Sequence, residues 1–167
     1  MESAAASVDP MNAEPQALHA QLTNHPFVQG MESSHVEMMA RIAVPVHFAE
    51  GEQVFHQGGK ADRLFLVLKG CIALEVYNAD YGPIPIQMVE SGDVLGSSWF
   101  VPPYKWNFDA KAVRETDALA FDGKTLLEMC DRQLDFGYDL MKRMASIVDQ
   151  RLNAARDHLQ DVYGTSR

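Results

Sequence analysis

Seven short segments rich in β-branched and aromatic residues follow one another between residues 44 and 121, separated by turns that contain glycine. Glycine supplies the positive φ that tight turns need. Many short strands at this spacing are typical of an antiparallel sandwich or jelly roll rather than an open parallel sheet. The predicted strands are residues 44–49, 53–55, 64–68, 72–77, 84–89, 108–113 and 119–121.

Helical patterns flank this β region on both sides. A short helix is expected at residues 16–23, because the residue before Pro26 disfavours the helical region. Ser34 and Glu37 have the spacing of a capping box, which predicts a second helix beginning there. A short helix at 124–130 and a long one at 133–162 follow the strands. The predicted fold class is mainly β, with some α: an antiparallel double-stranded β-helix (jelly roll) with short N-terminal helices and a long C-terminal helix.

One domain is expected at residues 16–162, with the β roll at 44–122 and tails at 1–15 and 163–167. Along the long helix, apolar or small residues recur in alternating steps of four and three, the spacing of a coiled-coil seam. At 1.5 Å per residue the helix would extend roughly 45 Å, farther than a small barrel can cover. We therefore predict a homodimer through this helix, with packing on its own barrel as the alternative. The predicted interface residues are Met141, Ala145, Val148, Leu152, Ala155, Leu159 and Val162.

Charge and composition limit the partners that the chain can have. Fourteen Lys and Arg against 23 Asp and Glu give a formal charge of −9, which opposes binding to nucleic-acid phosphates. The apolar runs fall far short of the roughly 20 residues that span a bilayer, and the N-terminus lacks the features of a secretory signal. Two cysteines, Cys71 and Cys130, are too few for the usual iron–sulfur ligand set. We expect a cytoplasmic protein without disulfides or membrane contact.

Three glycine-containing segments carry a family resemblance: FAEGEQVFHQG at 48–58, ADRLFLVLKG at 61–70 and SGDVLG at 91–96. With the order of helices and strands, they resemble the cyclic-nucleotide-binding domain of the catabolite activator protein (Crp/Fnr) superfamily. The first two look like that family's first strand pair and the strand and turn that follow. The third looks like the start of its phosphate-binding cassette. The resemblance covers about residues 27–162.

The resemblance implies a site in which backbone amides and a buried arginine bind the cyclic phosphate, while a glutamate after the glycine binds the ribose. Here Ser97 stands in place of the glutamate, Phe108 of the arginine and Asp109 of a hydroxyl residue. Losing one buried charge partner costs about 2–5 kcal/mol. We therefore predict a degenerate cassette that binds cyclic AMP in the usual pose no better than millimolar.

Aromatic residues are concentrated in the same segment. Five of the chain's fifteen lie between Trp99 and Phe108, and Pro102 and Pro103 stiffen the loop. Two interpretations stay open: the rings form a pocket for a flat or apolar ligand, or they fill the pocket and complete the core. The candidate ligand-binding residues are Gly96, Ser97, Ser98, Trp99, Phe108, Asp109, Ala110 and Arg156.

The leading functional hypothesis is a stand-alone regulatory sensor, not an enzyme. It would take a small-molecule effector and signal through the dimer helix or a partner protein. Because the chain ends at Arg167, we expect no recognition helix and no direct DNA binding. One alternative is a cyclic nucleotide or cyclic dinucleotide receptor with a nonstandard pose, in which Arg156 or Lys111 supplies the charge. The other is a metal-dependent, cupin-like enzyme, although no zinc-site spacing or catalytic motif is present, so we assign no metal, cofactor or catalytic residue.

Overall fold

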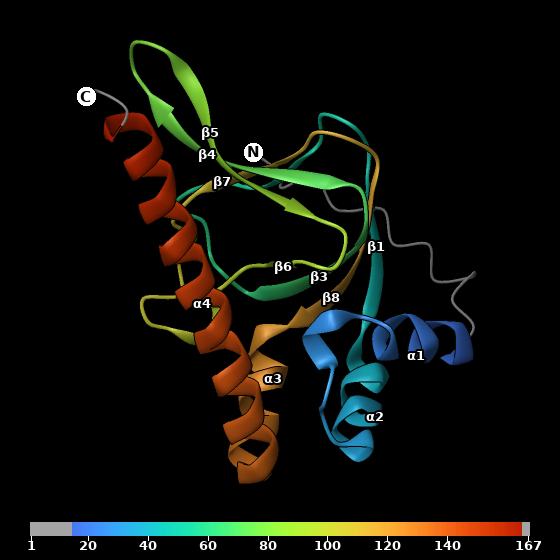
Figure 1. Cartoon of the computed structure of the whole chain (residues 1–167). Coiled ribbons are helices and arrows are strands. Elements are labelled where there is room, and N and C mark those ends of the chain that lie inside the picture. The colour runs from blue at the N-terminus through green and yellow to red at the C-terminus, as the bar shows by residue number, and fades with distance from the viewer. Residues whose placement is uncertain (1–14, 165–167) are drawn as a thin grey trace.

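Eight antiparallel strands form two four-stranded sheets, in the orders β1-β8-β3-β6 and β2-β7-β4-β5. Figure 1 shows the computed structural model, which describes residues 15–164. The strands are β1 (Val44–Phe48), β2 (Gln53–Phe55), β3 (Arg63–Lys69), β4 (Cys71–Asn78), β5 (Gly82–Glu90), β6 (Val94–Leu95), β7 (Asp109–Ala112) and β8 (Thr116–Asp122). This arrangement confirms the predicted fold class.

One strand was missed by the sequence analysis. Strand β6 has only two residues, Val94 and Leu95, which pair with Leu66 and Phe65 of β3. Two residues are too few to show the alternation of apolar and polar side chains that marks a strand. Its short pairing nevertheless fixes the point where the chain leaves the first sheet.

The helices are α1 (Pro15–Thr23), η1 (Pro26–Val28), α2 (Ser33–Ile42), η2 (Ser98–Phe100), α3 (Gly123–Arg132) and α4 (Leu134–Tyr163). The capping-box prediction is wrong. Helix α2 begins at Ser33, so Ser34 lies inside its first turn, and Glu32 is the N-cap residue without a side-chain cap bond. The Ser34 hydroxyl instead donates to the Glu32 carboxylate at 3.1 Å.

Two apolar cores hold these elements together. The first lies between the sheets and includes Phe48, Phe65, Leu74 and Leu95. The second lies between the roll and the four α-helices, where Phe136 of α4 is fully buried. Figure 1 shows α1, α2 and α3 gathered at one end of the roll.

Helix α4 packs closely only over its first part. Phe136, Gly137, Leu140 and Met144 are its buried residues. A Cβ on Gly137 would lie 2.9 Å from the Cys130 carbonyl oxygen, so the missing side chain lets α3 and α4 approach. The helix then runs beside the roll, toward the same end of the molecule as the β4–β5 hairpin (Figure 1).

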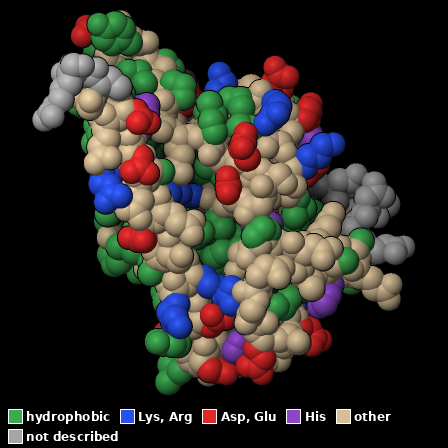
Figure 2. All heavy atoms as spheres, in the orientation of Figure 1, with side chains coloured by type: hydrophobic (Ala, Val, Ile, Leu, Met, Phe, Trp, Pro, Cys, Tyr) green, Lys and Arg blue, Asp and Glu red, His purple; other side chains and the backbone are tan. Residues whose placement is uncertain are grey.

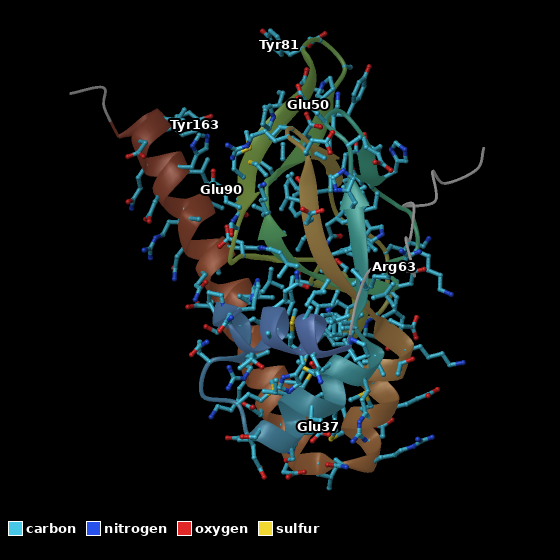
Figure 3. All side chains as sticks on the ribbon, turned by 90° about the vertical axis from the view of Figure 1, so that its right-hand side faces the viewer. Glu37, Glu50, Arg63, Tyr81, Glu90 and Tyr163 are labelled. Carbon is cyan, nitrogen blue, oxygen red and sulfur yellow. The ribbon has the colours of Figure 1, made fainter. Side chains whose placement is uncertain are left out.

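The outer helices include residues that the sequence analysis placed in the tails. Helix α1 begins at Pro15, and α4 ends at Tyr163 with Gly164 as its C-cap, whereas residues 1–14 and 165–167 of the predicted tails lie outside the described residues. Figure 3 places Tyr81 at the tip of the β4–β5 hairpin and Glu37 at the opposite, helical end. No helix within residues 15–164 combines the length and the apolar character needed to cross a membrane.

Candidate ligand-binding cassette

The cassette, residues 96–110, connects β6 to the start of β7. It begins at Gly96, whose φ of +97° is a conformation that residues with a Cβ rarely adopt. A Cβ at this position would lie 2.9 Å from the Arg63 carbonyl oxygen and 3.1 Å from Cη2 of Trp106. Gly96 is therefore required both by the turn and by the close approach of the Trp106 ring.

Backbone hydrogen bonds attach the end of the cassette to the turn between β2 and β3. The Trp106 amide donates to the Gly59 carbonyl at 2.9 Å, and the Gly58 amide donates to the Trp106 carbonyl at 2.8 Å. A third bond runs from the Ala61 amide to the Tyr104 carbonyl at 2.8 Å. These bonds fix the Trp106 side chain above Gly96.

The cassette rings divide between the two cores. Trp106 is 6% exposed and stacks on Phe55, with centroids 3.9 Å apart and planes 8° from parallel. Phe108 is partly buried against the inter-sheet core. Trp99 instead joins the helix-side core, where its ring meets Phe100 edge-on, and its Nε1 has no hydrogen-bond partner within residues 15–164. Trp106 therefore packs on the end of β2 and Phe108 on the inter-sheet core, whereas Trp99 packs in the helix-side core.

The polar candidates bond within the protein. The Asp109 carboxylate accepts a hydrogen bond from the backbone amide of Gln57 at 2.7 Å and lies 3.8 Å from His56 Nδ1. Asp109 thus faces the end of β2. The Ser98 hydroxyl accepts a bond from the Asn107 side-chain amide at 3.4 Å. Lys105 is the only lysine or arginine among residues 96–110.

A second cation approaches from α4. Arg151 donates a hydrogen bond to the carbonyl oxygen of Val94, at the start of β6. Burial lowers the pKa of the Arg151 guanidinium below its ordinary value, although the nearby Asp93 carboxylate opposes this shift. Arg151 therefore links the long helix to the strand that leads into the cassette.

Comparison with known proteins assigns the family. The family model of the cyclic nucleotide-binding domain matches residues 45–133. This chain belongs to that family. A CRP-like cAMP-activated global transcriptional regulator of Mycobacterium tuberculosis is 22% identical over 138 residues, which cover 82% of this chain and 59% of the regulator. The domain thus spans about three fifths of the length of the curated relatives it matches.

Solved structures show the same fold. A cyclic nucleotide-binding domain from Methylobacillus flagellatus KT superposes with a TM-score of 0.77 at 15% identity, covering 88% of this chain and 84% of the other. The regulatory subunit of a cAMP-independent protein kinase A from Trypanosoma cruzi, bound to guanosine, gives 0.68 at 22% identity, with coverages of 89% and 51%. At these identities the likeness establishes the fold.

Arg156 was predicted to bind the ligand, but the structure does not place it in the cassette. Its guanidinium is exposed and lies 3.7 Å from the Asp157 carboxylate on the same helix. Sequence reasoning missed Arg151, yet a signal was present: Leu140, Met144, Ile147 and Arg151 follow one another in steps of four, three and four residues. That spacing places Arg151 on the face of α4 that packs against the domain.

Two open depressions on the described surface lie elsewhere. One, of about 650 Å³, is lined by Lys69, Glu90 and Arg114 among others, and Figure 3 labels Glu50 and Glu90 from it. The other, of about 550 Å³, surrounds His47 and Asp117. No cassette residue lines either of these depressions.

Proposed function

We propose that this domain is a regulatory sensor, not an enzyme, whose cassette no longer takes cyclic AMP in the family's usual pose. The observation that carries the proposal is the position of Trp106, whose ring is held against Gly96 where the cassette begins. An apolar ring there offers neither charge nor a bidentate donor to a phosphate.

The charges of the cassette support the same conclusion. Asp109 is anionic and already accepts a bond from the Gln57 amide, while Ser97 replaces the ribose-binding glutamate expected from the family. The one cassette cation, Lys105, forms an isolated backbone β-bridge with Lys60, outside the named strands. A dianionic or monoanionic phosphate therefore has no buried cationic partner within the cassette.

Output through α4 is the second part of the proposal. Six of the seven predicted interface residues, Ala145, Val148, Leu152, Ala155, Leu159 and Val162, are exposed, whereas Met141 packs partly on its own core. Leu152 is 66% exposed and Val162 56%. Figure 2 shows hydrophobic side chains at several points along the outer edge of α4. The same stripe on a second copy is a matching partner, and a partner protein with an amphipathic helix is the alternative.

Calorimetric titration of the purified full chain tests the cassette. Cyclic AMP and cyclic GMP should give no saturation at micromolar concentrations, in line with a loss of about 2–5 kcal/mol for a missing charge partner. Stoichiometric, micromolar binding of cyclic AMP would overturn the proposal.

A receptor with a nonstandard pose is the second candidate, and Arg151 is the observation that favours it. This partly buried cation bonds to the first residue of β6, whereas Arg156 is exposed. Cyclic di-GMP and guanosine are the probes to use, the latter because the Trypanosoma cruzi neighbour is bound to a nucleoside without a phosphate. A melting shift with cyclic di-GMP that disappears in Arg151→Gln would establish this candidate.

A further inference from the structure

Three potential metal ligands meet at the helical end of the domain, away from the cassette. Glu32, His35 and Asp135 each offer one ligand atom, and these atoms all lie within 4.8 Å of one another. The His35 Nε2 atom lies 3.2 Å from Asp135 Oδ2 and 3.9 Å from Glu32 Oε2. Figure 2 shows acidic side chains gathered at the lower end of the molecule, where α2 and α4 begin.

The imidazole is held in place by its surroundings. The His35 side chain is 6% exposed and meets the Phe136 ring edge-on, with centroids 5.5 Å apart. Both carboxylates are open to solvent, with Glu32 67% and Asp135 71% exposed. A buried histidine therefore directs one nitrogen at an accessible pair of carboxylates, a layout that an ion can enter from water.

Proton donors at this cluster are fewer than its acceptors. Nε2 carries at most one proton, so it can donate to only one of the two carboxylates at a time. The Ser34 hydroxyl also donates to the Glu32 carboxylate, at 3.1 Å, but it carries no positive charge. Neither Lys nor Arg forms an ion pair with Glu32 or Asp135 in the described part of the chain. A divalent cation would offset both negative charges and use the nitrogen as a ligand.

We propose that Glu32, His35 and Asp135 bind a divalent transition-metal ion, with Zn²⁺ as the first ion to test. One imidazole nitrogen and two carboxylates form a donor set that suits Zn²⁺, Mn²⁺ or Fe²⁺, whereas Mg²⁺ prefers oxygen ligands alone. Three protein ligands leave positions for water, consistent with the exposure of the carboxylates.

The affinity is limited by the other ring nitrogen. With the metal on Nε2 the ring proton moves to Nδ1, which is buried without a partner within residues 15–164. Metal-ligating histidines usually donate this proton to a second group, and losing such a group weakens binding by about 10–100-fold. We therefore expect a site weaker than a structural zinc centre.

The three ligands come from two different helices, so a bound ion would connect those helices. Glu32 and His35 lie at the start of α2, and Asp135 lies in the first turn of α4, 100 residues after His35. A bound ion would tie the beginning of the long helix to the N-terminal helices. This inference does not depend on what the cassette binds.

Zn²⁺ titration of the chelator-treated full chain, followed by calorimetry and by the melting temperature, tests the site. We expect one Zn²⁺ per chain and a higher melting temperature, with no shift from Mg²⁺ at the same concentration. Asp135→Asn and Glu32→Gln should each weaken Zn²⁺ binding by roughly tenfold or more. Because each variant is compared with and without Zn²⁺, any effect of the substitution on folding alone cancels.

Two control variants separate this site from other acidic positions. Asp131→Asn makes the same change at an exposed position of α3, outside the cluster, and this variant should bind Zn²⁺ like the parent. Asp117→Asn removes a carboxylate that lies 2.7 Å from His47 Nδ1, the other histidine that contacts two acids. The proposal is wrong if the parent takes up no Zn²⁺, or if Asp117→Asn abolishes binding while Asp135→Asn does not.

Discussion

The indole of Trp106 lies face to face on the ring of Phe55, 3.9 Å between centroids. Phe55 ends β2, and Trp106 precedes β7, the strand that pairs with β2. The stack therefore joins the cassette to the second sheet at the point where Gly96 leaves the first. The Trp106 ring also lies against Gly96, where an added Cβ would be 3.1 Å from its Cη2.

Removing the indole should cost stability and open a space. For Trp106→Ala we expect the free energy of unfolding to fall by about 3–5 kcal/mol, since a large buried side chain is lost. Urea denaturation measures this. Because apolar cavities admit small apolar molecules, indole should raise the melting temperature of the variant and leave the parent unchanged. A loss below about 1 kcal/mol, the size expected for exposed Tyr81→Ala, would show that the ring is not packed.

Gly96 should tolerate no side chain. Gly96→Ala places a Cβ 2.9 Å from the Arg63 carbonyl at a φ of +97°, and we expect a loss of roughly 1–3 kcal/mol from backbone strain plus the cost of the clash. Gly51→Ala is the matched control, because its φ is +85° but nothing lies within 4 Å of the added Cβ. Equal losses in the two variants would contradict the close approach at Gly96.

Arg151 should stabilise the domain and Arg156 should not. Arg151→Gln removes a charged donor from the Val94 carbonyl, and we expect the free energy of unfolding to fall by about 1.5–3 kcal/mol. Hydrogen exchange should rise at β6 and in the middle of α4. Arg156→Gln, an exposed change on the same helix, should stay within about 0.5 kcal/mol of the parent. Similar effects of the two changes would show that Arg151 does not hold α4 to β6.

His25 makes stability fall in acid. Burial lowers the pKa of His25 below its ordinary value of 6.5, outweighing the hydrogen bond between Nε2 and the Val67 carbonyl. Its Nδ1 accepts a bond from the Phe27 amide at 3.1 Å, which requires the neutral ring. The unfolded chain therefore binds the proton first, so this contribution is complete above pH 6.5 and is lost as the pH falls through the folded pKa.

The free energy of unfolding, measured from pH 5 to 8, tests whether stability decreases as the pH falls. The parent should lose stability below pH 6.5, by at most about 1.4 kcal/mol per pH unit for one proton. His25→Asn keeps an oxygen that can accept from the Phe27 amide but does not titrate. Parallel pH curves for the two proteins would exclude His25 as the cause.

A single charge in the stripe of α4 should separate the subunits. Leu152→Asp is expected to weaken the dimer by roughly 2 kcal/mol or more, the loss typical of a central interface residue. Light scattering at micromolar concentration should then show monomers. Ala154→Asp puts the same charge two residues farther along, off the predicted seam, and should remain dimeric. A monomeric parent would remove the dimer from the proposed function.

Local sequence signals were sufficient for most of the fold. Short runs rich in β-branched and aromatic residues, separated by glycine turns, located seven strands, because such residues favour extended backbone and glycine permits tight turns. The stripe of apolar and small residues along α4 was also visible in the sequence, since its steps of four and three repeat over seven residues. The strands and the stripe on α4 are patterns among residues close together in the chain, so they can be read from the sequence alone.

The arrangement of the cassette and the meeting of Glu32, His35 and Asp135 were decided by tertiary structure. The sequence placed Trp99 and Phe108 in one aromatic group, but the chain turns between them, so Trp99 enters the helix-side core and Trp106 covers Gly96. His35 and Asp135 are 100 residues apart, and no spacing rule connects them. The distance between such groups depends on how sheets and helices pack, because packing forces act through space rather than along the chain.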